Sequence, residues 1–286
     1  MSNKVAIVTD STAYLPQEQI QKYNITVTPL SVIWGEDVYR DGIDILPEEF
    51  YTRLANSKTL PTTSQVTLGV MQETFQSLLD QGYDVLGLFL SSRISGTFQS
   101  AVQACEMLGN SAGRISVLDT LWTTMAMGWP ILTAARAARA GESLSECQKI
   151  AEEACANTGV LFVVETLEFL RRGGRIGGAQ ALLGTALNLK PILEMRNGKI
   201  EAVERIRTKQ KAMHRVVEIV AERIQGRPPI RLAVTHASSE ADALSLLEAA
   251  RSELDPVETM CCPLSPVIGA HAGPGTIALN YMFGIP

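Results

Sequence analysis

The sequence predicts an α/β fold built from two domains. Its first half alternates buried strand patterns with helical patterns, which is typical of a doubly wound parallel sheet. A length of 286 residues is also more than one average domain needs. The alternation breaks near residues 157–159, where two successive helical patterns are followed by a new strand. We therefore predict one α/β domain at residues 1–158 and a second at residues 159–286.

The first half is expected to form a parallel, Rossmann-like sheet. Residues 5–9 are continuously apolar, as strands buried on both faces of a parallel sheet are. A helix should begin near Pro47, because proline and acidic residues favour the first turn. The other expected strands are residues 25–33, 85–90 and 115–118, and the other expected helices follow Pro16 and cover 68–80 and 97–108.

The second half is expected to form a mixed sheet. Asn197-Gly198 lies between two strand patterns, and this dipeptide is a strong signal for an antiparallel hairpin. Helical patterns at 124–140 and 143–158 lead into this half. Its expected strands are 160–164, 192–195, 200–206, 231–235 and 257–264, and its helical patterns are 166–172, a stretch ending at 189, 209–225 and 241–254.

Composition excludes several classes of function. There are 25 basic and 30 acidic residues, a net charge of −5, and no basic excess of the kind that nucleic-acid binding needs. The sequence is 46% apolar and 19% charged, which favours a folded core over disorder. No apolar run reaches the roughly 18 residues of a membrane helix, and the first residues show no signal-peptide pattern. We therefore expect a cytoplasmic protein without stable membrane insertion.

The common catalytic and cofactor motifs are absent. The sequence has no GxxxxGK[ST] phosphate loop, GxSxG elbow, HExxH motif or GxGxxG after a strand. Its five cysteines form no CxxC pair, and its three histidines are far apart. We expect no metal site, no cofactor and no catalytic residues.

Three hydroxyl-rich segments are expected at the carboxyl ends of the first sheet's strands, where ligands bind in such sheets. They are residues 10–12, 62–65 and 91–97. Their serines and threonines have an alternative role as helix caps. A site built from hydroxyls and backbone N–H groups, with no obligatory lysine or arginine, suits a single carboxylate better than a polyphosphate.

Two glycine-rich segments are further candidates. Residues 171–178 hold three arginines among four glycines, which suits either a phosphate or partner contact or a flexible exposed turn. Residues 269–275 surround His271 with small residues and a proline. We expect the second segment to be a tight loop with a functional histidine.

These motifs together resemble the DegV family of bacterial fatty-acid-binding proteins, over essentially the whole chain. The resemblance rests on VTDST at 8–12, YRDG at 39–42, TSQ at 63–65, SGTFQSA at 95–101, GGRI at 173–176, KPIL at 190–193 and HAGPG at 271–275. It implies two α/β domains with one long-chain fatty acid, such as palmitate or oleate, bound between them.

The resemblance also implies roles for individual residues. Thr63 and Ser95 would hold the carboxylate, Gly96 would add a backbone N–H, and His271 would border the headgroup. Arg172 would be the family's arginine before the glycine pair. Because phosphoryl transfer needs positive charge, we expect Arg172 and also Arg175 to lie outside the acyl channel and face a partner. That partner is a separate ATP-dependent fatty acid kinase subunit, which phosphorylates the bound carboxyl group for phospholipid synthesis. On this interpretation the chain is a lipid-binding protein and not itself an enzyme.

Two alternatives remain open from the sequence. The first is a stand-alone acyl-transfer or hydrolytic enzyme in which Ser95 is the nucleophile and His271 the base. No acidic third residue and no elbow motif support it. The second is a regulatory or assembly protein in which a bound lipid is only structural.

Overall fold

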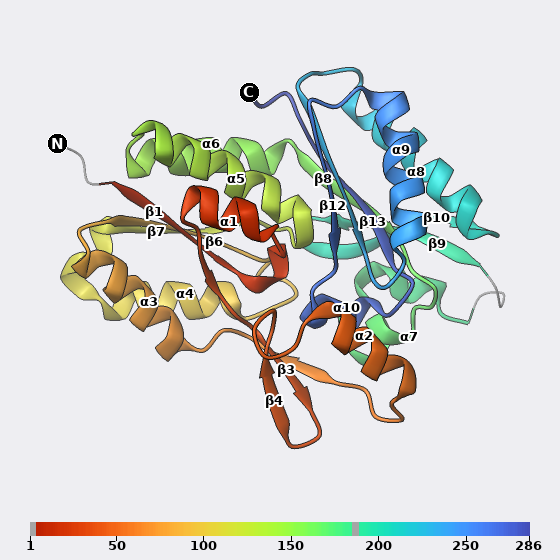
Figure 1. Cartoon of the computed structure of the whole chain (residues 1–286), viewed down its shortest axis with the longest axis horizontal. Helices are drawn as coiled ribbons and strands as arrows, with labels where there is room; N and C mark the ends of the chain where they lie inside the picture. The colour runs from red at the N-terminus through yellow and green to blue at the C-terminus, as the bar shows by residue number, and fades with distance from the viewer. Residues whose placement is uncertain (1–3, 185–188) are drawn as a thin grey trace.

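The protein consists of two α/β domains, and the computed structural model describes residues 4–184 and 189–286 (Figure 1). The first domain holds a parallel sheet in the order β2-β1-β6-β7. Every residue of its strand β1 is buried, as the continuous apolar pattern predicts. The strands are β1 (Val5–Asp10), β2 (Thr26–Thr28), β6 (Asp84–Phe89) and β7 (Ile115–Asp119).

Helices cover both faces of this first sheet. One face packs against α3 and α4, and the other packs mainly against α5 and α6, with α1 beside them (Figure 1). This arrangement confirms the predicted Rossmann-like domain. The helices are α1 (Gln17–Tyr23), α3 (Leu68–Asp80), α4 (Thr97–Met107), α5 (Thr124–Ala140) and α6 (Leu144–Ala156).

The second domain holds a mixed sheet in the order β10-β9-β8-β13-β11-β12, which confirms the prediction for this half. Its neighbouring strands are antiparallel, except β11 and β12, which are parallel. Helices α8 (Lys209–Ile224) and α9 (Glu240–Leu254) cover one face of the sheet. The strands are β8 (Thr158–Val163), β9 (Lys190–Arg196), β10 (Lys199–Ile206), β11 (Ile230–His236), β12 (Glu258–Pro263) and β13 (Ile277–Phe283).

A small antiparallel sheet, β4-β3-β5, stands beside the two large ones. The prediction of one strand at 25–33 is wrong, because the chain leaves β2 at Pro29 and enters β3 as part of this other sheet. Proline has no N–H with which to continue a ladder. The small sheet consists of β3 (Ser31–Trp34), β4 (Asp37–Arg40) and β5 (Thr62–Ser64), with α2 (Pro47–Asn56) between β4 and β5.

Other parts of the second domain differ from prediction. The prediction of a loop at 269–275 is wrong for its first half, because Pro266–Ala272 forms helix α10. The Ser265 hydroxyl accepts the Ile268 N–H at the start of this helix. The central strand β13 was not predicted. The helical pattern near 166–172 forms α7 (Glu168–Arg172), and Gly177–Leu182 is a 3₁₀ helix; residues 185–188 lie outside the described part of the chain.

Helix α5 packs against strands of both large sheets and so joins the domains. Its amino end is held by Asn280 of β13, which is fully buried. The Asn280 Oδ1 atom accepts hydrogen bonds from Thr124 Oγ1 at 2.7 Å and Ala126 N at 3.0 Å. The Asn280 Nδ2 atom donates to the Ala233 carbonyl at 3.1 Å. One amide thus fixes α5 to two strands of the second sheet. Among the described residues, no helix is long and apolar enough to cross a membrane.

Candidate functional site

A cavity of about 220 Å³ lies between the two domains. Side chains alternate along the strands of the second sheet, so Leu161 and Val163 pack under α8 and α9 while Val160 and Phe162 face the cavity. Leu90 and Ile94 contribute from the first domain. The remaining apolar lining residues are Leu30, Leu170, Met195, Ile200, Leu264, Val267, Ile268, Ala272 and Ala278.

Two of the predicted site residues meet across this cavity. Thr63 on β5 and His271 on the last turn of α10 are joined by a hydrogen bond of 2.8 Å between Thr63 Oγ1 and His271 Nε2. The ring of His271 also packs closely on the glycine-rich loop. A Cβ atom at Gly173 would lie 2.1 Å from His271 Nδ1, so only glycine fits there without a shift. The loop is therefore a close-packed support for His271.

Ser95 and Gly96 line the same cavity, in the loop between β6 and α4. Ser95 Oγ lies 3.1 Å from Thr97 Oγ1 and also accepts the Thr97 N–H at 3.3 Å. A Cβ atom at Gly96 would lie 1.9 Å from Oε1 of Gln65, which follows β5. The contact between Gly96 and Gln65 thus brings the loop carrying Ser95 against the strand carrying Thr63.

Gln65 is a lining residue that we did not single out from the sequence, although it belongs to the TSQ motif. Its Nε2 atom donates to Ser100 Oγ at 2.9 Å, which fixes the side chain on α4. Thr123, Thr124 and Thr276 also line the cavity, and nothing in their local sequence distinguishes them from ordinary turn and cap residues.

The two arginines expected to face a partner are placed differently. Arg172 is outside the cavity lining, with 57% of its side chain exposed and an ion pair to Glu168. Arg175 instead lines the cavity, together with Thr63, Ser95 and His271, and its position outside the acyl channel stays a prediction. Its Nε donates to the Ile94 carbonyl at 3.0 Å and its Nη1 to the Gly173 carbonyl at 2.6 Å. These two bonds turn the guanidinium inward at the domain interface.

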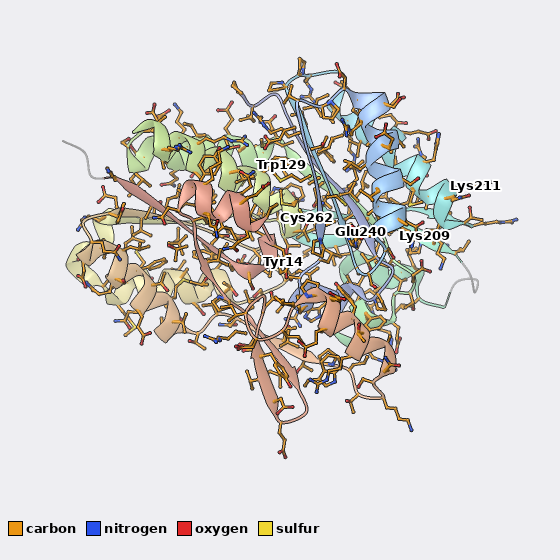
Figure 2. The ribbon with its side chains drawn as sticks, in the orientation of Figure 1. Tyr14, Trp129, Lys209, Lys211, Glu240 and Cys262 are labelled. Carbon is orange, nitrogen blue, oxygen red and sulfur yellow. The ribbon has the colours of Figure 1, made fainter. Side chains whose placement is uncertain are left out.

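The segment 10–12 does not join this site. Asp10 and Ser11 line a second cavity of about 500 Å³, together with Tyr14 and Cys262, which Figure 2 labels. Outside both cavities, His214 is exposed beside Glu218, and His236 Nδ1 accepts the Ser239 N–H. The structure thus gathers Thr63, Ser95, Gly96 and His271, and separates them from the first hydroxyl-rich segment.

The charges around the site favour an anion. Among the described residues that line the first cavity there is no aspartate or glutamate, and Arg175 supplies a permanent positive charge. Burial, and to a smaller extent the charge of Arg175, lowers the pKa of His271 to about 4. The imidazole is therefore neutral at neutral pH. The described residues contain no group of three or more side chains suited to a metal ion.

The same geometry bears on nucleophilic catalysis. A catalytic serine needs its base within hydrogen-bond reach. Here His271 Nε2 contacts Thr63, and Ser95 Oγ contacts Thr97. His271 Nδ1 is buried and has no hydrogen-bond partner among the described residues, so no carboxylate orients the ring. The arrangement can bind an anion with an apolar tail, and it lacks the contacts of an activated serine.

The neutral state of His271 is testable by titration. We expect NMR of the ligand-free protein to give His271 a pKa of about 4, because burial disfavours the imidazolium. The unfolded chain takes up this proton near pH 6.5, so His271 destabilises the folded protein progressively as the pH falls from about 6.5 to about 4. His271→Asn should therefore lose less unfolding free energy than wild type across that interval. A His271 titration near pH 6.5 would contradict this account.

Two buried carboxyl groups change the unfolding free energy with pH in the opposite direction to His271. Comparison of wild type with His271→Asn separates the effect of His271 from theirs. Burial raises the pKa of Asp10 to about 6 and that of Asp41 to about 7. Their folded forms bind protons more readily than the unfolded chain does, so they favour folding as the pH falls. Both groups are present in wild type and variant, and their contribution cancels in the difference.

Known proteins are similar in sequence to almost the whole of this chain. Residues 4–283 match the family model described as "Uncharacterised protein, DegV family". A DegV domain-containing protein of Streptomyces coelicolor is 38% identical over 281 residues, covering 98% of each chain, and the DegV protein of Bacillus subtilis is 36% identical, covering 98% of this chain and 99% of its own.

Solved structures agree. A DegV family protein from Thermus thermophilus, described as fatty-acid binding, is 35% identical with a TM-score of 0.92, covering 98% of this chain and 99% of its own. DegV from Bacillus subtilis, a fatty acid binding protein, gives a TM-score of 0.89 at 36% identity, with 99% and 100% covered. A stearic acid-binding protein from Eubacterium ventriosum gives a TM-score of 0.91 at 26% identity, covering 98% of this chain and 99% of its own. The chain described here belongs to the DegV family.

Proposed function

We propose that this protein binds one long-chain fatty acid, such as palmitate or oleate, in the cavity between its domains. The observation that carries the proposal is the cavity itself, whose walls are apolar and whose polar groups include the hydroxyls of Thr63 and Ser95 without an acidic residue among the described lining. The fatty-acid binding described for the relatives from Thermus thermophilus and Bacillus subtilis supports this ligand class.

The carboxylate is assigned to Thr63, Ser95 and the backbone N–H of Gly96. A carboxylate only accepts hydrogen bonds, so the Thr63 hydroxyl must donate its proton to the ligand. Neutral His271 makes this possible if its proton is on Nε2, because Nε2–H then donates to Thr63 Oγ1 across the 2.8 Å contact. Arg175 supplies the opposite charge from the cavity wall.

The acyl tail is assigned to the face of the second sheet that lines the cavity. Val160, Phe162, Met195 and Ile200 present apolar side chains there. Burial of each methylene contributes about 0.8 kcal/mol, so the tail provides most of the affinity and the hydroxyls fix its orientation.

We further propose that the bound acid is presented in the cytoplasm to an ATP-dependent fatty acid kinase subunit, which forms an acyl phosphate for lipid metabolism. Transfer of a phosphoryl group needs positive charge near the transferring phosphate. Exposed Arg172 is the candidate for contact with the partner. Arg175 and His271 lie by the headgroup and are candidates for charge and positioning at the carboxylate.

Substitution of Ser95 tests the headgroup assignment. We expect Ser95→Ala to weaken palmitate binding about 10-fold or more, because a hydrogen bond to a charged group contributes about 1.5–3 kcal/mol. Titration calorimetry and thermal unfolding should be measured on the same variant. If Ser95 only stabilises the start of α4, stability falls by about 1 kcal/mol and palmitate affinity is unchanged.

Ser92→Ala is the matched control for this experiment. Ser92 lies in the same loop, is exposed and is not among the lining residues. Its substitution should change neither quantity. Esterase activity that Ser95→Ala abolishes would instead support the enzyme alternative.

The partner assignment is tested by Arg172→Ala in paired assays of palmitate binding and acyl-phosphate formation with a cognate kinase subunit. We expect unchanged affinity, because Arg172 is outside the cavity, and a clear loss of acyl-phosphate formation. His271→Ala should reduce both, since its ring holds Thr63. Arg251→Ala, on exposed helix surface in α9, is the control. Normal kinase turnover with Arg172→Ala would contradict a partner role for this residue.

A further inference from the structure

One hydroxyl in the cavity wall has no hydrogen-bond partner. Thr123 precedes α5, lines the cavity and is 8% exposed. Its Oγ1 atom is buried and has no partner among the described residues. A buried hydroxyl without a hydrogen bond is unfavourable, because it loses its bonds to water and gains none in return. This atom therefore needs an explanation.

The reason for the missing bond lies in Asn280. A threonine at the N-cap position normally accepts the N–H of the third helical residue, which here is Ala126. That N–H is already bonded to Asn280 Oδ1, and the Thr124 hydroxyl donates to the same oxygen. Thr124 also has a left-handed backbone, with φ of 56°, which is rare for a β-branched residue. The amino end of α5 is thus capped from β13, and the Thr123 hydroxyl is left over.

The strand register places this hydroxyl away from the Thr63–His271 pair at one end of the cavity. Thr276 lies next to α10, since its hydroxyl donates to the Ala272 carbonyl, adjacent to His271. Along β13, Ala278 pairs with Phe162 and Asn280 pairs with Val160. The four-residue step from Thr276 to Asn280 spans about 13 Å in an extended strand. The Asn280 end, where Thr123 lies, is therefore removed from the Thr63–His271 pair. It is nearer the loop of Ser95, because the Trp122 carbonyl accepts the Ser91 N–H at 2.9 Å.

We propose that Thr123 makes the cavity selective for a fatty acid that carries a hydroxyl or oxo oxygen along its chain. This inference rests on the proposed fatty-acid function. A methylene chain leaves the Thr123 hydroxyl without a hydrogen bond. An oxygen on the chain can accept a hydrogen bond from this hydroxyl, and a hydroxyl on the chain can also donate one to it. Rotation about χ1 exchanges the hydroxyl and methyl groups of threonine between staggered positions, so the oxygen can be directed into the cavity that the side chain lines.

The test compares stearic acid with a positional series of monohydroxystearic acids by titration calorimetry. We expect wild type to bind the best-placed hydroxystearic acid about tenfold more tightly than stearic acid. Thr123→Val should abolish that preference and bind stearic acid at least as tightly as wild type does. Thr133→Val is the matched control, because Thr133 is buried on the same helix, outside the cavity, and its hydroxyl already bonds the Trp129 carbonyl. It should keep the wild-type preference.

Thermal unfolding of the ligand-free Thr123→Val variant gives an independent readout. Because the hydroxyl makes no bond, its replacement by a methyl group should leave the melting temperature unchanged or raise it. A clear fall would overturn the inference by showing that the hydroxyl is bonded in the folded protein. Equal affinity of wild type for stearic and all hydroxystearic acids would also overturn it, while leaving the fatty-acid function standing. Failure to bind any of these acids would overturn the proposed function itself.

Discussion

The arrangement of the two domains depends on the buried amide of Asn280. Its oxygen holds the amino end of α5 and its nitrogen holds the neighbouring strand β11, so the helix that packs on the first sheet is fixed to the second. A fully buried amide is stable only if both ends are bonded, and this one is. The walls of the cavity come from both domains, which this attachment and the packing of α5 on both sheets hold together.

The cavity combines two requirements that usually conflict. An apolar tail needs dry walls, whereas a carboxylate needs hydrogen-bond donors and positive charge. The protein separates them by bringing Thr63, Ser95 and His271 from different elements to one part of an otherwise apolar lining. Burial keeps His271 neutral, so the positive charge there comes from Arg175, whose guanidinium is held by two backbone carbonyls. Gly173 permits the close contact with His271, and Gly96 permits the close contact with Gln65.

Much of the fold could be predicted from the sequence, because buried parallel strands contain continuous apolar runs, as β1 does at residues 5–8. Strand β13 could not, since Asn280 interrupts its apolar pattern and the partners of that amide are distant in the chain. The motifs that gave the family resemblance named Thr63, Ser95 and His271, and the structure places all three on one cavity. The inward position of Arg175 follows from a carbonyl at Ile94, 81 residues away, and no local pattern indicates it.

The most direct test of the account is the lipid content of the purified protein, measured by mass spectrometry under native and denaturing conditions. We expect about one non-covalent long-chain fatty acid per chain, lost when the protein is denatured, because the tail is held only by the apolar walls and the headgroup only by hydrogen bonds and charge. A covalent acyl adduct on Ser95 would contradict the binding function and support catalysis. A protein that carries no lipid and fails to bind added palmitate or oleate would contradict the account as a whole.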